Sequence, residues 1–176
     1  PDKVKLALDR TGYRAGDTLE VTVTPPHAGR GVLLVESDRL LHVQEIDIGG
    51  GDGKASGRFT IPVTGDWERH DVYVTALVFR GGSAASQVTP ARAVGVVHVP
   101  MRRDDRRVAV GLRFPAQSRP QQDLPVTVSV PQLAGRKAHV TVSATDVGIL
   151  NITRFPVPDA NAHFFAQRRL ATDAYD

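Results

Sequence analysis

The side chains that could perform catalysis or bind a metal are scattered along this chain. Histidine can bind a metal ion or transfer protons at neutral pH, and no two histidines here have the short spacing of a helical metal site. They are His27, His42, His70, His98, His139 and His163. The sequence has no cysteine, which excludes a thiolate zinc site, a disulfide framework and a cysteine nucleophile within it. We therefore expect scattered strand or surface histidines, although a site assembled across several strands stays open.

Three other short motifs are better explained by structure than by catalysis. Gly53-Lys54, in the glycine-rich stretch 49–57, resembles a phosphate loop, but Ala55 stands where the magnesium-binding Ser or Thr would be. We interpret this stretch as a hairpin loop. The paired carboxylates Asp104 and Asp105 lie between arginines and would point apart in an extended linker, which argues against acid–base work. Trp67 precedes a long predicted strand, and we expect it to anchor a core or an interface.

The composition is that of a globular chain whose cores are built from aliphatic side chains. Hydrophobic residues make up 41%, charged residues 23% and aromatic residues 6% of the chain. The net charge of +3 and the few aromatic side chains do not suit nucleic-acid binding, so no nucleic-acid partner is expected. No apolar run approaches the ~20 residues that cross a bilayer. The chain begins at the edge of a predicted strand and without a signal peptide. We interpret this as typical of a fragment excised from a longer protein.

The elements that would position these residues come from a sequence that is repeated. The stretch from Leu19 to Arg30 reappears from Leu124 to Arg136 with one residue inserted, and each copy follows an alternating strand. A repeat on the order of 100 residues is far longer than a solenoid unit and has the size of one β-sandwich domain. We therefore predict an all-β chain of tandem immunoglobulin- or fibronectin-like sandwiches. The boundaries are a complete sandwich over 1–100, a linker over 101–107 and an incomplete second sandwich over 108–176.

The alternation of apolar and polar residues predicts short strands in both modules. In the first module they are Val4–Asp9, Thr18–Pro25, Gly31–Glu36, Leu41–Ile48, Gly57–Pro62, Asp71–Arg80 and Ala91–Val99. In the second they are Val108–Phe114, Leu124–Val130, Ala138–Ala144 and Gly148–Ile152. Asp159 is a plausible N-cap for a short C-terminal helix over Ala160–Leu170. Three strands of the second sandwich are missing, so we expect the natural protein to continue beyond this sequence.

The end of the chain carries a more distinctive pattern than the rest. Ser143-Ala-Thr-Asp-Val-Gly-Ile-Leu-Asn-Ile-Thr-Arg-Phe-Pro-Val-Pro-Asp159 and the residues after it resemble the bacterial alpha-macroglobulins. The matching positions are Asp146, Val147, Gly148, Ile149, Leu150, Asn151, Pro158, Asp159, Phe164, Phe165, Arg168, Arg169, Tyr175 and Asp176. The resemblance is specific from Val140 onward. It departs from the family at Ala160, where a second proline is expected.

This resemblance implies that the chain is a structural segment of a large protease trap built from serial macroglobulin domains. In that family a protease cuts an exposed bait region, the molecule rearranges, and an internal thioester reacts with the attacking protease. The bait would follow the segment that ends this chain, which would explain the unfinished second module. The thioester motif contains cysteine and must belong to another domain. No enzymatic activity and no cofactor are implied for this stretch.

The family also implies a location and partners for the full-length protein. It would be a lipoprotein of the periplasm, anchored in the inner membrane through a lipid outside this fragment. Its partners would be target proteases, neighbouring macroglobulin domains and, as in some relatives, a penicillin-binding protein. The alternative function is a tandem immunoglobulin-like module of a bacterial adhesin or surface scaffold. A carbohydrate-binding sandwich is a third option, but it would need more exposed aromatic rings than this chain offers.

Overall fold

The computed structural model describes residues 3–50, 55–81 and 92–172. The chain divides into two units, and each is described by itself. The first unit comprises the residues up to Arg102 together with those from Phe164 onward, and the second comprises Arg103–His163. The second unit is therefore an insertion, in sequence, between two parts of the first.

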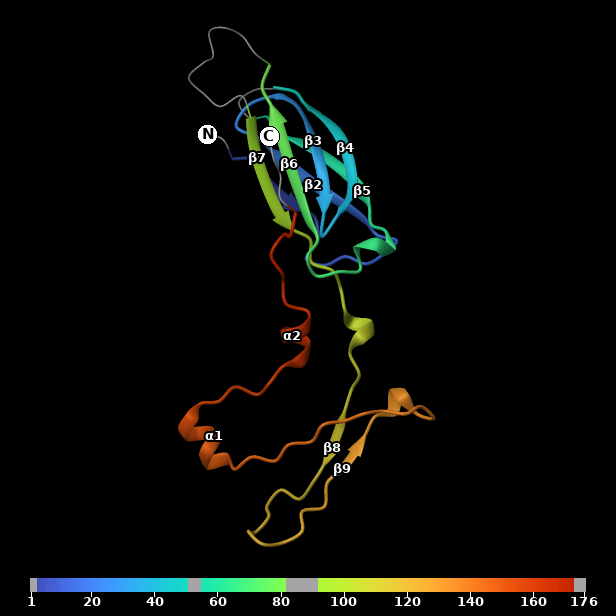
Figure 1. Cartoon of the computed structure of the whole chain (residues 1–176), viewed down its shortest axis with the longest axis vertical. Helices are drawn as coiled ribbons and strands as arrows, with labels where there is room; N and C mark the ends of the chain where they lie inside the picture. Colours follow the sequence, from blue (N-terminus) through green and yellow to red (C-terminus); the bar gives the residue numbers. More distant parts are fainter. Residues whose placement is uncertain (1–2, 51–54, 82–91, 173–176) are drawn as a thin grey trace. The chain divides into compact units, whose positions relative to one another are not determined.

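The first unit is a β-sandwich of two antiparallel sheets (Figure 1). The three-stranded sheet has the order β1-β2-β5 and consists of β1 (Lys5–Leu8), β2 (Thr18–Thr24) and β5 (Gly57–Pro62). The four-stranded sheet has the order β4-β3-β6-β7 and consists of β4 (Leu40–Ile48), β3 (Gly29–Glu36), β6 (Tyr73–Phe79) and β7 (Arg92–His98). A short 3-10 helix, η1 (Gly65–Trp67), precedes β6.

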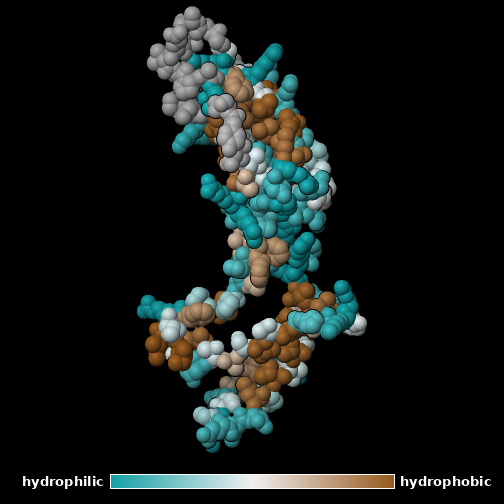
Figure 2. All heavy atoms as spheres, in the orientation of Figure 1, coloured by the Kyte–Doolittle hydropathy of each residue, from teal (hydrophilic) through white to brown (hydrophobic). Residues whose placement is uncertain are grey.

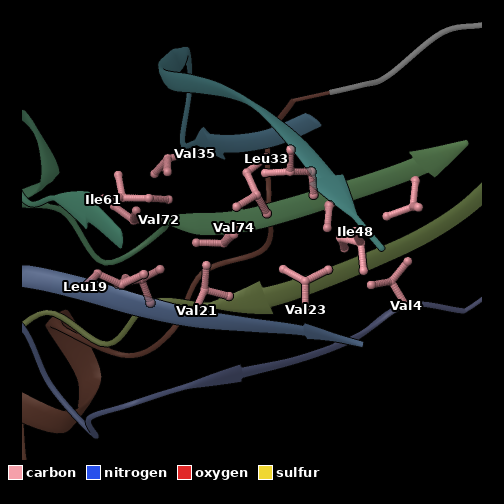
Figure 3. Close-up of a cluster of buried hydrophobic side chains, with 14 of the residues drawn as sticks. Val4, Leu19, Val21, Val23, Leu33, Val35, Ile48, Ile61, Val72 and Val74 are labelled. Atoms are coloured by element: carbon pink, nitrogen blue, oxygen red, sulfur yellow. The ribbon is translucent and has the colours of Figure 1, made fainter. Parts of the chain in front are cut away.

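Alternate residues of these strands form the core between the two sheets. Figure 3 shows side chains of β2 facing side chains of β3 and β6 across the interior. Leu19, Val21 and Val23 of β2 are fully buried, while the residues between them are half-buried. Burying such an aliphatic side chain contributes about 1.5–3 kcal/mol. Trp67, which the sequence analysis placed in a core or an interface, is 1% exposed and belongs to this core.

The start of the chain connects the two sheets at one edge of the sandwich. The backbone N–H of Val4 donates to the carbonyl oxygen of Val94 at 2.9 Å, just before β1 joins β2 in the other sheet. A Cβ atom on Gly95 would lie 2.3 Å from the carbonyl oxygen of Val4. Glycine is therefore required at position 95, because any side chain would push the two backbones apart.

The second unit contains little regular structure among its described residues. The strands β8 (Gly111–Arg113) and β9 (Thr127–Ser129) pair in an antiparallel ladder. The unit also contains the 3-10 helices η3 (Asp104–Arg106) and η4 (Pro131–Leu133) and the α-helices α1 (Val147–Thr153) and α2 (Ala160–Phe164). Many of its apolar side chains are exposed, and Figure 2 shows hydrophobic residues gathered on the surface of this unit.

The predicted all-β sandwich class is confirmed, and the strands of the first module lie where the alternation placed them. The hairpin predicted for residues 49–57 is wrong, because β4 and β5 belong to different sheets. Residues 51–54 of that stretch lie outside the described residues. The strand predicted at Ala138–Ala144 is also absent, since these residues have no regular secondary structure. Within the described ranges, no helix is long and apolar enough to cross a membrane.

Candidate functional site

The Asp-Val-Gly-Ile-Leu motif forms the start of a helix rather than the predicted strand Gly148–Ile152. Asp146 caps α1, because its Oδ1 atom accepts hydrogen bonds from the backbone N–H groups of Gly148 at 2.7 Å and Ile149 at 3.2 Å. This cap satisfies two of the donors that a helix leaves unpaired at its first turn. The motif residues Val147, Gly148, Ile149, Leu150 and Asn151 therefore lie in α1.

Asp159 caps the second helix as predicted, but that helix is shorter than expected. The Oδ1 atom of Asp159 accepts a hydrogen bond from the backbone N–H of Ala162 at 2.9 Å. The helix ends at Phe164, six residues before the predicted end at Leu170. Pro158 precedes the cap outside any helix, as expected of a residue that cannot donate a backbone hydrogen bond.

The chain after α2 returns to the first unit and docks on the sandwich. We call Gln167–Thr172 the C-terminal segment. The Tyr73 hydroxyl donates to the backbone carbonyl of Arg168 and accepts from the Gln167 side-chain amide at 3.1 Å. The backbone N–H of Arg168 donates to the His70 carbonyl at 3.3 Å. The Thr172 hydroxyl donates to the Ser37 carbonyl at 2.9 Å, so the C-terminal segment is attached along its length.

The surface that receives the C-terminal segment is one end of the four-stranded sheet. Tyr73 and Thr75 alternate with the core residues Val74 and Ala76, so they point to the outer face. An outer face usually meets water, yet Tyr73 and Thr75 are each only 7% exposed. Glu36, which pairs with Tyr73 in the sheet register, is 6% exposed and accepts a hydrogen bond from the Thr75 hydroxyl at 2.7 Å.

Polar side chains are concentrated beneath and beside this docking surface. The buried polar or charged residues among the described ones are Glu36, Ser37, Asp71 and Thr75. All four lie at the end of β3 or the start of β6, next to the C-terminal segment's partners Ser37, His70 and Tyr73. Burial of polar groups is costly unless they are hydrogen-bonded, so the contacts at this end of the sheet are specific ones.

A charged network fixes the loop that carries His70. The Arg69 guanidinium donates to both carboxylate oxygens of Asp71, at 2.9 and 3.0 Å, and lies 3.0 Å from Asp38. This pair of hydrogen bonds from Arg69 lowers the pKa of Asp71 below its usual value, although burial opposes the shift. The same bonds raise the pKa of Arg69. Both groups are therefore ionised at neutral pH and hold the His70 carbonyl in place for Arg168.

His98 completes this end of the sheet. Its ring meets the ring of Tyr73 edge to face, with centroids 5.2 Å apart, and its Nε2 atom lies 3.2 Å from the His70 carbonyl. The other histidines are not brought together into a site. Within the ranges that the structure describes, no group of three or more histidine or carboxylate residues could hold a metal ion.

The linker is attached to the sandwich by a second buried tyrosine. Tyr13 is fully buried, and its backbone exchanges hydrogen bonds with Pro100 at 2.9 Å and Arg102 at 2.7 Å. Its hydroxyl donates to Asp9 at 2.7 Å and accepts from the backbone N–H of Arg10 at 3.0 Å. Burial and the bond to Asp9 raise the pKa of Tyr13 to about 12. Burial would raise the pKa of Asp9 too, but hydrogen bonds from Tyr13 and Glu20 outweigh it and lower that pKa.

The hydrogen bonds of the C-terminal segment do not by themselves offset the cost of ordering it. A hydrogen bond contributes about 1 kcal/mol net to stability. Fixing the backbone of one residue costs about 1–2 kcal/mol. Hydrogen bonds alone therefore do not favour docking strongly, and Arg168 and Arg169 remain exposed on the docked segment. Half-buried Leu170 and Thr172 add contact area to the docked segment.

The family-motif residues of the sequence analysis thus fall in two places. Asp146–Asn151, Pro158 and Asp159 belong to the second unit, whereas Phe164, Phe165, Arg168 and Arg169 belong to the first. Tyr175 and Asp176 lie outside the described residues. Sequence reasoning missed Ser37, His70 and Tyr73 as partners of Arg168 and Thr172. The available signal was weak: a tyrosine and a threonine at outward positions of an otherwise apolar strand.

Known proteins share this chain's sequence and fold. The family profile described as "Alpha-2-macroglobulin bait region domain" matches residues 4–152. The chain is 73% identical over its whole length to "Alpha-2-macroglobulin" of Xylella fastidiosa (strain 9a5c), of which it covers 10%. It is 43% identical over 181 aligned residues to "Alpha-2-macroglobulin" of Escherichia coli (strain K12), of which it covers 11%. The chain therefore spans about a tenth of the length of these relatives.

Solved structures give the same family. Salmonella alpha-2-macroglobulin reacted with methylamine matches with a TM-score of 0.69 and 39% identity, over 97% of this chain and 11% of that one. Trypsin-activated alpha-2-macroglobulin from Escherichia coli matches with a TM-score of 0.68 and 36% identity, over 96% of this chain and 11% of that one. These matches favour the macroglobulin reading over the adhesin and carbohydrate-binding alternatives. The chain belongs to the bacterial alpha-2-macroglobulin family, and its residues 4–152 match the family's bait region domain.

Proposed function

We propose that this chain is the section of a protease-trapping inhibitor that anchors its bait region and transmits the cleavage of that bait. Several findings support this role: the family match, the solved relative activated by trypsin, and the return of the C-terminal segment to the sandwich. The last observation carries the proposal. In this proposal the segment that leads to the bait is held on the sandwich by specific hydrogen bonds. A cut in the bait would then change how the chain is attached at the docking surface of this segment.

The sandwich suits the part of a fixed anchor. The chain matches the native form of the Escherichia coli relative and its trypsin-activated form with the same TM-score of 0.68. A scaffold that keeps its fold in both states can transmit a change made in the chain attached to it. Its role in this proposal is mechanical, and we assign no catalytic step to its residues.

We further propose that the second unit is the first part of a second macroglobulin sandwich, completed by chain outside this sequence. The support is the pattern of exposed apolar side chains along its extended stretches. The residues of these stretches are exposed, and the large apolar ones fall at alternate positions: Val108, Val110, Leu112, Phe114, Leu124, Val126, Val128, Val140 and Val142. Such an alternation is typical of strands with one face on a core. The bait would then lie between the two halves of this domain.

The partners and location of the parent protein follow from the family and stay proposals. We propose target proteases and neighbouring macroglobulin domains as partners, a penicillin-binding protein as a further one, and the periplasm as the compartment. A lipid anchor outside this fragment would hold the protein at the inner membrane. Fractionation of cells that express the full-length protein tests this location. We expect the protein in the inner-membrane fraction, and its recovery in the cytoplasm would contradict the proposal.

The test of the mechanical role uses the full-length protein and a protease that cuts its bait. We expect small-angle scattering to report a change in shape when the bait is cut, with the protease retained in the product. The control is the same protein with the bait's cleavage sites substituted, which should keep its shape in the presence of the protease. An unchanged shape after complete cleavage would contradict the proposal.

A further inference from the structure

We propose that the C-terminal segment, Gln167–Thr172, is a releasable clasp on the outer face of the four-stranded sheet. It occupies its docking surface while the chain beyond it is intact, and it leaves that surface once this chain is cut. The inference rests on the proposed function, because it takes the bait to follow the segment. It adds the identity of the contacts that would open first.

The contacts of the clasp are few, specific and polar. Tyr73 supplies one hydroxyl that bonds both Arg168 and Gln167, while His70 and Ser37 supply backbone carbonyls. All of these contacts join uncharged groups, so release removes no ion pair. Undocking is therefore not prevented by a stranded ionic group.

Release of the clasp leaves the sandwich intact. The core between the sheets is formed by residues from Val4 to Val99, with Met101 packed against it, and it includes no residue of the segment. The Glu36–Thr75 hydrogen bond and the Arg69–Asp71 pair also lie within the sandwich itself. The segment can thus leave without unfolding the surface that receives it, as a releasable clasp requires.

Chain attachment on both sides favours the docked state. An undocked segment that is held at each end has few conformations available, so the entropy gained by undocking is small. A cut in the chain beyond the segment frees one end and raises the entropy of the undocked state. Because the hydrogen bonds contribute only a modest net energy, freeing one end of the segment can shift its equilibrium from the docked to the undocked state.

The uncovered surface would extend an apolar face that is already exposed. Thr75 pairs with Val96 in β7, and Leu34, beside Thr75 in β3, pairs with Val43 in β4. Val96 and Val43 are each 52% exposed on the outer face. Departure of the segment would join the surface around Tyr73 to this row of side chains across the whole width of the sheet.

Hydrogen exchange on the full-length protein tests the clasp directly. The reporter is the Arg168 backbone N–H, which donates to His70, and the matched control is the Val99 N–H, which donates to Val72 within the sandwich. After bait cleavage we expect Arg168 to exchange roughly 10- to 100-fold faster, while Val99 keeps its protection. Unchanged exchange at Arg168, in a sample whose shape has changed, would overturn the inference.

A second test locks the clasp. The chain has no cysteine, so the pair Ser37→Cys and Thr172→Cys introduces the only thiols of this section. With the disulfide formed, we expect the bait to be cut at the normal rate but the rise in exchange at residues 167–172 to be lost, and reduction should restore it. The single variant Thr172→Cys is the control for the substitution.

The results separate the two proposals. If cleavage leaves the shape of the wild-type protein unchanged, the proposed function fails. If the wild-type shape changes but the segment stays protected, only the clasp is wrong. Should the locked variant form no disulfide, the exchange of the wild-type Arg168 amide still decides the matter.

Discussion

Two buried tyrosines attach the parts of the chain that leave the sandwich. Tyr13 holds the start of the linker through Pro100 and Arg102, and Tyr73 holds the C-terminal segment through Arg168. Each hydroxyl both donates and accepts a hydrogen bond. The two side chains differ in their second partner, because Tyr13 bonds an ionised carboxylate and Tyr73 a neutral amide. This difference makes their substitutions distinguishable.

Replacement of Tyr13 by phenylalanine should destabilise the sandwich. Tyr13→Phe removes a charge-assisted bond to Asp9 and leaves the Arg10 N–H without its acceptor. We expect a loss of about 1.5–3 kcal/mol in the free energy of unfolding, measured by urea denaturation. Tyr73→Phe is the control, and it should cost less because its partners can reach water. Equal losses for the two variants would contradict the assignment of Tyr13 as the stronger anchor.

The Asp71–Arg69 pair predicts a defined acid sensitivity. The pKa of Asp71 is lowered in the folded state, so its contribution to stability is full above the unfolded-state pKa and is lost as the pH falls through the folded pKa. Asp71→Asn should therefore destabilise the protein at neutral pH, by on the order of 1 kcal/mol because Arg69 is partly solvated. The difference from wild type should begin to shrink below about pH 4 and should vanish only below the lowered folded-state pKa. Urea unfolding at several pH values measures it, and a difference that persists in acid would refute this explanation.

At the scale of elements, two aspartates start the two α-helices of the second unit. Asp146 bonds two backbone N–H groups and Asp159 bonds one. The helices are short and their residues are largely exposed, so tertiary packing supplies little of their stability. In such helices the cap is a large share of what favours the helical state.

Loss of the Asp146 cap should unfold α1 locally. Asp146→Ala costs about 1 kcal/mol in helix stability, and we expect faster hydrogen exchange at the Leu150 N–H, which donates to the Asp146 carbonyl. Thr145→Ala, one residue outside the helix, serves as the matched control and should leave exchange unchanged. If both variants exchange like wild type, the capping bonds do not stabilise α1.

The bridge between the residues before β1 and β7 predicts a strict requirement at Gly95. Gly95→Val places a branched side chain where even a Cβ would lie 2.3 Å from the Val4 carbonyl. We expect the Val4–Val94 bond to break, with a loss of on the order of 1–3 kcal/mol in stability. Gly81→Val, at a position with no atom within 4 Å of an added Cβ, is the control. If both variants unfold at the same temperature as wild type, the edge of the sandwich accommodates the added side chain and the requirement at Gly95 is refuted.

The sequence predicts the elements that local patterns determine and misses those that depend on distant partners. Leu19, Val21 and Val23 alternate as a strand and lie in one, because the pattern and the fold agree. The strand predicted at Gly148–Ile152 is wrong because the Asp146 cap favours a helix where no partner strand is present. The docking of Arg168 on Tyr73 joins residues 95 positions apart and leaves no local signal. The sequence therefore marks Arg168 as a family-motif residue, but it does not reveal the surface on which Arg168 docks.

At the scale of the whole molecule, the second unit exposes a face that the longer protein is expected to cover. Leu112 and Val128 are opposite each other in the β8–β9 ladder and are 54% and 36% exposed. Exposed apolar faces and open strand edges favour association. A charged substitution on this face should therefore have a different effect in the isolated chain than in the longer protein.

Val128→Lys tests this difference. In the isolated chain we expect the lysine to reduce self-association, measured by analytical ultracentrifugation. In the full-length protein it should lower thermal stability, because a charge would enter a completed core. Thr127→Lys, on the other face of the same strand, is the matched control and should do neither. A full-length Val128→Lys protein as stable as wild type would contradict completion of the sandwich on this face.

The separation of Tyr73 from Arg168 has a consequence for biogenesis. The sandwich core is complete once the chain has been made to about Met101, whereas the segment that covers Tyr73 is made later. At roughly 5–20 residues per second, the chain between Met101 and the segment takes on the order of 3–13 s to synthesise. During that interval no segment is available to cover the docking surface. The docking surface is therefore made before its occupant, and the clasp can close only after the whole second unit has been synthesised.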